Sequence, residues 1–423
     1  MTRVGLVSSE PIRPAMGGIG IRYLELARGL SARGFDLQVL SPAEPAESAA
    51  AGLHAVEVEL YGPEPLARLL STVDAVVAQG QLANEVVLAE PEVPVIVDLY
   101  DPWMIENLHY APELGYEPFR NDHASWVLQL SRADGFLCAS REQRLFYLGF
   151  LAALGRVNPR SLAQDGGIGQ RLMEVPFGAP ARQDPLGGIL PPRREAEIRI
   201  FFGGVYDWYD IETFVAALER LEGLDWTAWV VRHPRPEATP QEKYRELERA
   251  CRARRWWGSR VQAIDWVAAD RRCDLLGDVD LLASPHLPGL ESELAFRTRF
   301  LDALAAGCPA VATAGGAVSR MLSERDAGWV VAPRDADALA AAIRDVSTGG
   351  AHVTERVARG RELASELTWD RVVEPLVAFL GAPLRDPARG DDLLAASDRR
   401  LPAEPALDRI RRRVRRMARG RRS

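Results

Sequence analysis

Residues 284–313 read SPHLPGLESELAFRTRFLDALAAGCPAVAT. The stretch begins where the apolar run 279–284 ends, and it finishes in a second apolar run at 308–313. Both runs predict buried strands, and the segment between them predicts a helix closed by Ala306 and Gly307. A strand, a helix and a second strand joined by short connections form the repeating unit of a parallel sheet. The stretch therefore predicts an α/β fold.

The same alternation of short apolar runs and helical patterns extends along most of the chain. A segment rich in proline and glycine at 177–196 interrupts it and predicts an interdomain linker. The sequence thus predicts two facing, doubly wound, Rossmann-like α/β domains at 1–180 and 181–380, with a spacer and basic tail at 381–423. Strands are expected at 3–9, 35–41, 54–60, 74–79, 93–99, 135–139, 171–176, 197–202, 225–232, 260–264, 279–284, 308–313 and 328–332, and helices at 335–347 and 366–380.

Composition narrows the class of protein. The chain has 423 residues, a net charge of −7 and no apolar run long enough to span a membrane. Its four cysteines are far apart, which argues against a disulfide framework and favours a reducing cytoplasm. Lys243 is the only lysine, and this bias towards arginine is typical of a GC-rich, for example actinobacterial, genome.

The C-terminal tail differs in charge from the rest of the chain. Residues 401–423 contain nine arginines against Glu404 and Asp408, so the tail carries +7 and the remaining residues carry −14. The acidic body argues against a specific nucleic-acid binder. An apolar stripe at helical spacing in the tail predicts a peripheral contact with an anionic membrane surface; a solvated tail and a tail folded back onto the acidic body are the alternatives. The stripe consists of Leu407, Ile410, Val414 and Met417.

Two glycine-rich loops follow predicted strands. MGGIGIR at 16–22 places Gly18 at a helix start, and FGGVYDWYD at 202–210 contains Gly203 and Gly204. Glycines allow close approach of a phosphate to a helix N-terminus. The first loop does not fit a dinucleotide fingerprint, because Tyr23 stands where the third glycine belongs and the second strand ends without an acidic residue. A plain tight turn is the alternative for the first loop, and a helix N-cap is the alternative for Asp210.

Charged residues gather at the start of the helix within 284–313. Arg297 and Arg299 lie near its first residues and Asp302 follows one turn on, which suits an anionic ligand held at a helix N-terminus. Glu291 and Glu293 precede the helix, and carboxylates can accept hydrogen bonds from sugar and ribose hydroxyls. A surface network of salt bridges is the alternative.

This segment resembles the donor site of family-4, retaining glycosyltransferases with the GT-B fold. The family's pattern has a glutamate, a second glutamate and an Ala-Gly-x-Pro turn into a strand. Its other features match in order: GGIG before a helix, ADGFLCAS at 133–140, EVPFGAP at 174–180 and GGVYDWYD. The resemblance covers roughly residues 3–375. Asp302 stands where the family has its second glutamate, and Glu293 corresponds best to the first.

The resemblance implies a role for each candidate residue. Glu293 would accept hydrogen bonds from the donor sugar, Asp302 would bind the ribose, and Gly18 would lie against the donor phosphates. The family's Arg/Lys pair is missing from GGVYDWYD, so Arg297 and Arg299, or Arg232, would hold the diphosphate. Three further pairs complete the expected site: Trp266 and Val267 at the base, Gly203 and Gly204 at the donor, and Asp98 and Asp101 on the acceptor side.

The implied activity is transfer of a sugar from a nucleotide-diphosphate sugar, without a bound metal or other cofactor. The acceptor stays open between a polysaccharide or lipid-linked glycan and a small metabolite of an antibiotic pathway. Two alternatives remain: a GT-B-fold scaffold that has lost activity, and a nicotinamide-dependent oxidoreductase, which the missing fingerprint disfavours.

Overall fold

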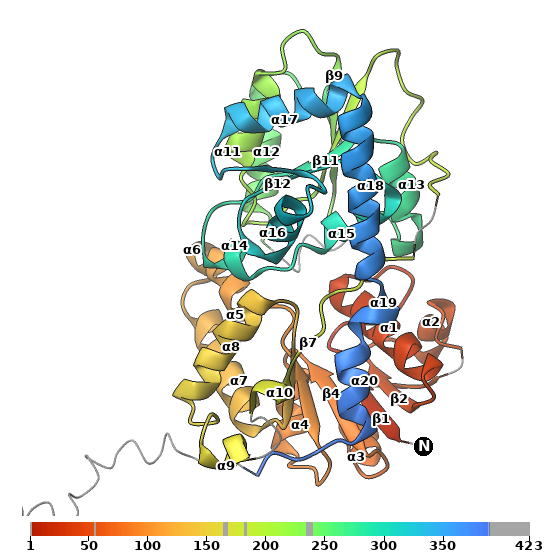
Figure 1. The fold of residues 1–423 in the computed structure, drawn as a ribbon, viewed down its shortest axis with the longest axis vertical. Coiled ribbons are helices and arrows are strands. Elements are labelled where there is room, and N and C mark those ends of the chain that lie inside the picture. Colours follow the sequence, from red (N-terminus) through yellow and green to blue (C-terminus); the bar gives the residue numbers. More distant parts are fainter. Residues whose placement is uncertain are drawn as a thin grey trace, which may run out of the picture.

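Two parallel sheets organise the chain, one above the other along the long axis of the molecule (Figure 1). The computed structural model describes residues 2–54, 56–163, 168–181, 184–233, 240–387 and 389. Its strands lie close to the predicted runs, and the expected pair of Rossmann-like domains is confirmed.

The first sheet has seven strands in the order β3-β2-β1-β4-β5-β6-β7. Its register pairs Arg3 with Asp36 between β1 and β2, and Val4 with Ala75 between β1 and β4. The strands are β1 (Arg3–Val7), β2 (Asp36–Ser41), β3 (Glu57–Leu60), β4 (Ala75–Gln79), β5 (Val95–Asp98), β6 (Gly135–Cys138) and β7 (Leu172–Glu174). The helices are α1 (Gly18–Ala32), α2 (Pro45–Ala50), α3 (Pro63–Leu70), α4 (Leu82–Leu88), α5 (Trp103–Glu106), η1 (Asn107–Tyr110), α6 (Ala111–Leu114), α7 (Glu117–Arg132), α8 (Arg141–Ala153), α9 (Pro159–Ala163) and α10 (Ile168–Arg171).

The second sheet has six strands in the order β10-β9-β8-β11-β12-β13. Gly307, at φ +75°, ends α15 in the left-handed region that glycine adopts most easily. The strands are β8 (Ile198–Gly204), β9 (Trp226–Val231), β10 (Val261–Ile264), β11 (Leu281–Ser284), β12 (Ala310–Thr313) and β13 (Trp329–Val331). The helices are α11 (Ile211–Glu219), α12 (Glu242–Ala253), η2 (Ala269–Arg271), α13 (Arg272–Gly277), α14 (Leu290–Leu294), α15 (Thr298–Ala306), α16 (Gly316–Glu324), α17 (Ala336–Thr348) and α18 (Ala351–Glu366).

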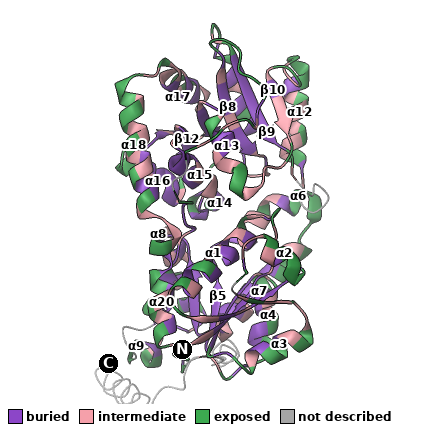
Figure 2. Ribbon diagram, turned by 90° about the vertical axis from the view of Figure 1, so that its right-hand side faces the viewer, coloured by how far each residue is buried: buried purple, intermediate pink, exposed green. Residues whose placement is uncertain are grey.

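The burial of the strands explains why their positions could be predicted from the sequence. Figure 2 shows buried strands inside and exposed helix faces outside in both domains. A strand covered on both faces needs a nearly continuous apolar run, as AVVAQ in β4 and WTAWVV in β9, which are buried throughout. The strand order reverses between β1 and β4 and again between β8 and β11, and ligands of such folds bind beyond the strand ends at these points.

The C-terminal part of the chain returns to the first domain, which corrects the predicted boundary at residue 380. Val373, Leu376 and Leu380 are buried in the same core as α1 and β1. The helix predicted at 366–380 is also two helices, α19 (Trp369–Val372) and α20 (Glu374–Gly381). Pro375 in the first turn of α20 explains the break, because it has no N–H to continue the ladder from α19.

Part of the expected loose spacer is packed against the first domain. Asp386 is buried and forms an ion pair with Arg156, whose side chain is also buried. Arg385 pairs with Glu92, and Arg389 pairs with Asp134. Residues 384–387 and 389 therefore form a strap on the first domain, and the predicted free spacer at 381–400 is wrong here. The basic tail at 401–423 lies outside the described residues.

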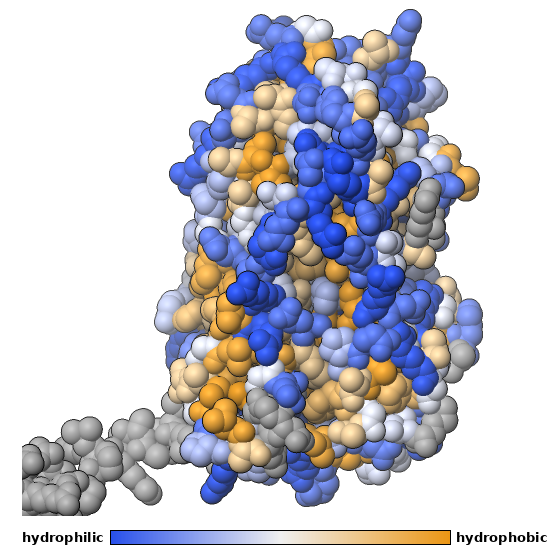
Figure 3. All heavy atoms as spheres, viewed as in Figure 1, coloured by the Kyte–Doolittle hydropathy of each residue, from blue (hydrophilic) through white to orange (hydrophobic). Residues whose placement is uncertain are grey.

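The surface itself is mostly polar on the face seen in Figure 3. Apolar side chains gather there over the first domain, towards α8, where Leu145 is among the exposed large apolar residues. No helix within the described ranges is long and apolar enough to cross a membrane.

Candidate functional site

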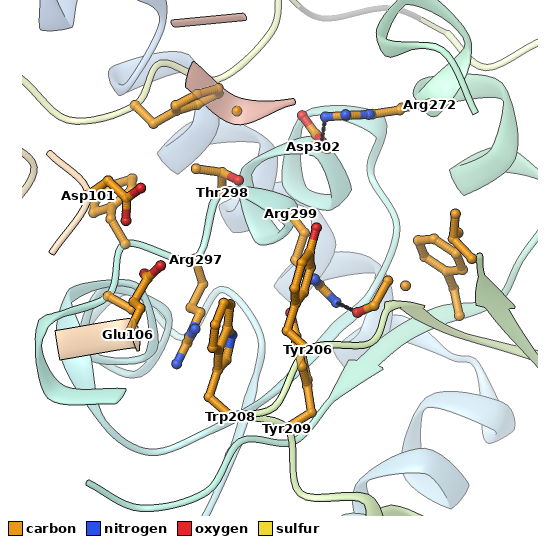
Figure 4. Close-up of a pocket in the computed structure, with 18 of the residues that line it drawn as sticks. Asp101, Glu106, Tyr206, Trp208, Tyr209, Arg272, Arg297, Thr298, Arg299 and Asp302 are labelled. Carbon is orange, nitrogen blue, oxygen red and sulfur yellow. Dashed lines mark hydrogen bonds and ion pairs between the residues drawn. The ribbon is translucent and has the colours of Figure 1, made fainter. Parts of the chain in front are cut away.

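A cavity of about 350 Å³ lies where the two domains meet. Its walls come from the loop after β5, from α5 and from the start of α1 in the first domain, and from α13, α15 and the loops after β8, β10 and β11 in the second. Figure 4 shows two carboxyl groups on one side of this cavity, with Arg299 and aromatic rings on the other. Most predicted site residues line it, namely Gly18, Asp101, Gly203, Gly204, Trp266, Val267, Arg297, Arg299 and Asp302.

Three expected residues do not line the cavity: Asp98, Glu293 and Arg232, the alternative for the diphosphate. Arg232 is half-exposed and forms an ion pair with Asp265, whereas the side chain of Asp98 is fully buried. Both of its carboxylate oxygens accept hydrogen bonds from Arg22, at 2.6 Å to Nε and 3.0 Å to Nη2. The Arg22 guanidinium also packs over the ring of Tyr100, which lines the cavity. Asp98 therefore positions a wall of the site, and its expected place on the acceptor side is corrected.

Glu293 is the second expected residue outside the cavity. Its side chain is exposed on α14, whereas Glu291 on the same helix is 2% exposed and accepts a hydrogen bond from Arg297 Nη2 at 2.6 Å. Residues two apart on a helix point in clearly different directions. Glu291 thus occupies the inward position that the sequence comparison had given to Glu293.

Glu10 already occupies the start of α1, where a donor phosphate was expected. Its two carboxylate oxygens accept hydrogen bonds from the backbone N–H groups of Gly17 and Gly20, each at 2.8 Å. An anion at a helix N-terminus is favoured by the helix dipole and its free N–H groups. Gly18 lies on the cavity wall, where a Cβ would come within 3.1 Å of the Tyr100 hydroxyl, but the anion at this helix end is a side chain of the protein.

Arg299 joins the glycine loop to the start of α15. Its Nη1 donates hydrogen bonds to the backbone oxygens of Phe202 and Gly204, at 3.0 and 3.1 Å, and to Ser284 Oγ at 3.2 Å. A Cβ at Gly203 would lie 2.6 Å from this nitrogen, and Gly203 has φ +95°. Only glycine suits this position, so the arginine and the glycine form one unit. Because the three bonds use Nη1, the rest of the guanidinium can serve a ligand.

Arg272, which the sequence did not single out, lies beside Asp302. The two side chains form an ion pair at 3.5 Å, and the guanidinium is 5.7 Å from the ring of Trp266. Burial raises the pKa of Asp302, while the charge of Arg272 opposes the rise. This corner combines a carboxylate acceptor, a cation and an aromatic face, which is the combination that a nucleoside needs.

Asp101 and Glu106 form a carboxyl pair on the first-domain wall. The pKa of Asp101 is raised by burial and, further, by the charges of Asp98 and Glu291, and a hydrogen bond with Glu106 opposes this rise. The pKa of Glu106 is raised well above its usual value by burial and by the charges of Asp101 and Glu291, and the charge of Arg297 opposes this rise. Two carboxyls this close disfavour double ionisation, so the pair takes up a proton more readily than a lone carboxyl does.

Aromatic rings from the two domains contact one another beside the cavity. Tyr206 and Trp208 stack with ring centroids 5.0 Å apart. The ring of Trp208 also meets His109 at 6.4 Å and Tyr110 at 6.2 Å, both from the first domain. Sequence analysis missed this contact and Glu106, although the aromatic spacing in VYDWYD was a visible signal.

Polar side chains also join the two domains, as in the ion pair between Arg320 of α16 and Glu142 of α8 at 2.8 Å. Gln143 is fully buried and donates to the backbone oxygens of Tyr100 and Leu294, one from each domain.

Asp210 caps α11 by accepting from the Thr213 N–H at 3.0 Å, as its alternative interpretation predicted. Within the described ranges, no group of three or more His, Cys, Asp or Glu side chains could hold a metal ion.

Comparisons with known proteins agree on the architecture, which is that of GT-B proteins. Residues 197–348 match the family model described as glycosyl transferases group 1. No curated protein sequence matches the chain.

Solved structures match nearly the whole chain at low sequence identity. HepE from Anabaena, in complex with UDP-glucose, is 15% identical with a TM-score of 0.66, over 90% of this chain and 100% of that one. Sucrose-phosphate synthase from Thermosynechococcus elongatus is 15% identical with a TM-score of 0.62, over 90% and 98%. WaaG, a glycosyltransferase involved in lipopolysaccharide biosynthesis, is 16% identical with a TM-score of 0.57, over 89% and 98%.

Proposed function

We propose that the protein is a glycosyltransferase that moves a sugar from a uridine-diphosphate sugar to an acceptor held by the first domain. The observation that carries the proposal is the cavity between the two sheets, where Arg297 and Arg299 stand at the start of α15 beside a glycine loop. The group 1 family match of the second domain and the UDP-glucose bound to HepE support the nucleotide class.

Each wall of the cavity has one task in this proposal. The base lies against Trp266 and Val267, the ribose hydroxyls donate to Asp302, and the diphosphate lies between Gly204 and the start of α15. The bond between the sugar C1 and the diphosphate oxygen breaks, and the acceptor oxygen bonds to C1. Arg299 and the positive end of α15 stabilise the charge that grows on the diphosphate, so no metal is needed.

Retention of configuration belongs to the same proposal, because the resemblance to family-4 enzymes implies it. The proton of the acceptor hydroxyl then passes to the departing diphosphate on the same face of the sugar. The inactive scaffold is the second candidate function, since Asp302 replaces a glutamate and the usual Arg/Lys pair is missing. Cytoplasmic location and membrane contact through the tail remain predictions from the sequence.

Titration with UDP, GDP, dTDP and NAD tests the class of protein directly. We expect saturable binding of UDP, weaker binding of GDP and dTDP and none of NAD, because the cavity has no dinucleotide fingerprint. Turnover of a UDP-sugar, followed by release of UDP, then separates an enzyme from a scaffold. Saturable binding of NAD with no binding of UDP would overturn the proposal.

Glu291 and Glu293 offer a matched pair of substitutions on one short helix. We expect Glu291→Gln to lower kcat/KM by about 10–100-fold, because a hydrogen bond to a charged group is worth ~1.5–3 kcal/mol and Arg297 loses its buried partner. Glu293→Gln should leave kcat/KM nearly unchanged, since its side chain is exposed. Steady-state kinetics with a UDP-sugar measures both. The opposite order would restore Glu293 as the donor-sugar residue.

A further inference from the structure

The acceptor side of the cavity has more carboxyl groups than cations to balance them. Asp101 and Glu106 both line the cavity and are hydrogen-bonded to each other, and the charge of Glu291 acts on both. Arg297 is the cation that acts on Glu106. Three carboxyls thus face one guanidinium.

The guanidinium of Arg297 already forms hydrogen bonds within the second domain. Arg297 Nη2 donates to Glu291 at 2.6 Å and to Ser292 Oγ at 3.3 Å. Even so, Oε1 of Glu291, whose residue is 2% exposed, has no hydrogen-bond partner among the described residues. Glu291 itself does not line the cavity, but its negative charge acts on both carboxyls that do, so this wall favours a bound cation.

Aromatic faces border the same wall. Trp208 lines the cavity together with Asp101 and Glu106, and the ring of Tyr110 lies 6.2 Å from the ring of Trp208. Figure 4 shows Trp208 on the side of the cavity that faces Glu106. Tryptophan and tyrosine faces attract cations, and ammonium groups are often held between such rings and carboxylates.

We propose that the acceptor is an amino-bearing polyol whose protonated amine binds between Asp101, Glu106 and Trp208. The inference rests on the proposed function and names the substrate class of its acceptor side. The ammonium takes the place of a proton that the carboxyl pair takes up readily, and its three N–H groups match carboxylate acceptors. The amine anchors the acceptor, and a hydroxyl of the same molecule remains the group that receives the sugar.

A neutral polyol is the competing acceptor, because carboxylates also accept hydrogen bonds from hydroxyls. Such a ligand would leave the carboxyl pair and the aromatic faces without a cation. The two classes of acceptor can be distinguished by one measurement. A positive charge on a single substituent should strengthen binding if the acceptor carries an amine, and should not if it is a neutral polyol.

Binding of glucosamine, glucose and N-acetylglucosamine, in the presence of saturating UDP, tests that property. The three sugars differ at one carbon, and the pH is chosen so that the glucosamine amine is protonated. We expect glucosamine to bind about tenfold more tightly than the other two, since charge-assisted hydrogen bonds are worth ~1.5–3 kcal/mol. Titration calorimetry or ligand-observed NMR gives the three dissociation constants.

Two variants link the preference to the carboxyl pair. Glu106→Gln should abolish the preference for glucosamine, whereas Glu113→Gln, a change at an exposed glutamate on α6, should keep it. Equal binding of the three sugars, binding of none, or a preference that survives Glu106→Gln would overturn the inference. If UDP itself does not bind to the unsubstituted protein, it is the proposed function that fails.

Discussion

Replacing Arg299 with alanine is expected to lower UDP affinity and kcat/KM by about two orders of magnitude or more. The substitution removes the guanidinium that we propose binds the diphosphate, a charged hydrogen bond worth ~1.5–3 kcal/mol, and it removes three hydrogen bonds that hold the glycine loop against α15. It also removes the guanidinium that packs 4.6 Å from the ring of Tyr209. Titration with UDP and steady-state kinetics measure the two losses separately.

Two controls identify what Arg299 contributes. Arg299→Lys keeps the charge but cannot form the forked bonds, so it should recover part of the affinity and little of the loop order. Arg220→Ala removes an exposed arginine that pairs with Asp337 in the same domain and should leave UDP affinity unchanged. Normal UDP binding by a folded Arg299→Ala protein would show that this arginine does not hold the diphosphate.

Asp98→Asn is expected to destabilise the protein by about 3–5 kcal/mol, the range for a buried ion pair that loses one partner. Both side chains of the Arg22–Asp98 pair are fully buried, so the substitution leaves the guanidinium without its counter-charge. Arg22 also donates to the backbone oxygen of Pro176 at the start of the linker. Chemical denaturation of the purified variant measures the loss in free energy of unfolding.

The matched control is Asp36→Asn. Asp36 pairs with Arg3 at 2.7 Å, but both side chains are 44% exposed, so the expected loss is below about 1 kcal/mol. An Asp98→Asn protein with normal stability and no turnover would return Asp98 to the catalytic role that the sequence suggested.

The fold could be predicted from the sequence because most of its strands are buried on both faces. Such strands need continuous apolar runs, and these runs are local features of the chain that require no partner to be recognised. The glycine loops and the Ala306-Gly307 turn could also be predicted, because their backbone geometry restricts which residues can occupy these positions. Most of the site residues predicted from the sequence do line the cavity, because strand ends in a parallel sheet meet at one edge.

The directions in which side chains point, and the partners with which they pair, could not be predicted from the sequence. Glu291 and Glu293 stand two residues apart, and only packing of α14 against the first domain turns one inward and leaves the other in solvent. Asp98 looked like a site residue until Arg22, distant in sequence, was found against it. Glu106 and Arg272 had no motif, so only their place on the cavity wall marks them.

The sequence alone thus determined the two α/β domains and the sheet edge at which the cavity lies, since these follow from local periodicity and backbone preference. Only the tertiary structure decided which charges are paired, which carboxyls lie close together, and that α19, α20 and the strap at 384–387 and 389 return to the first domain. Those outcomes depend on contacts between residues far apart in the chain, and the free energy of a charge depends on what surrounds it after folding.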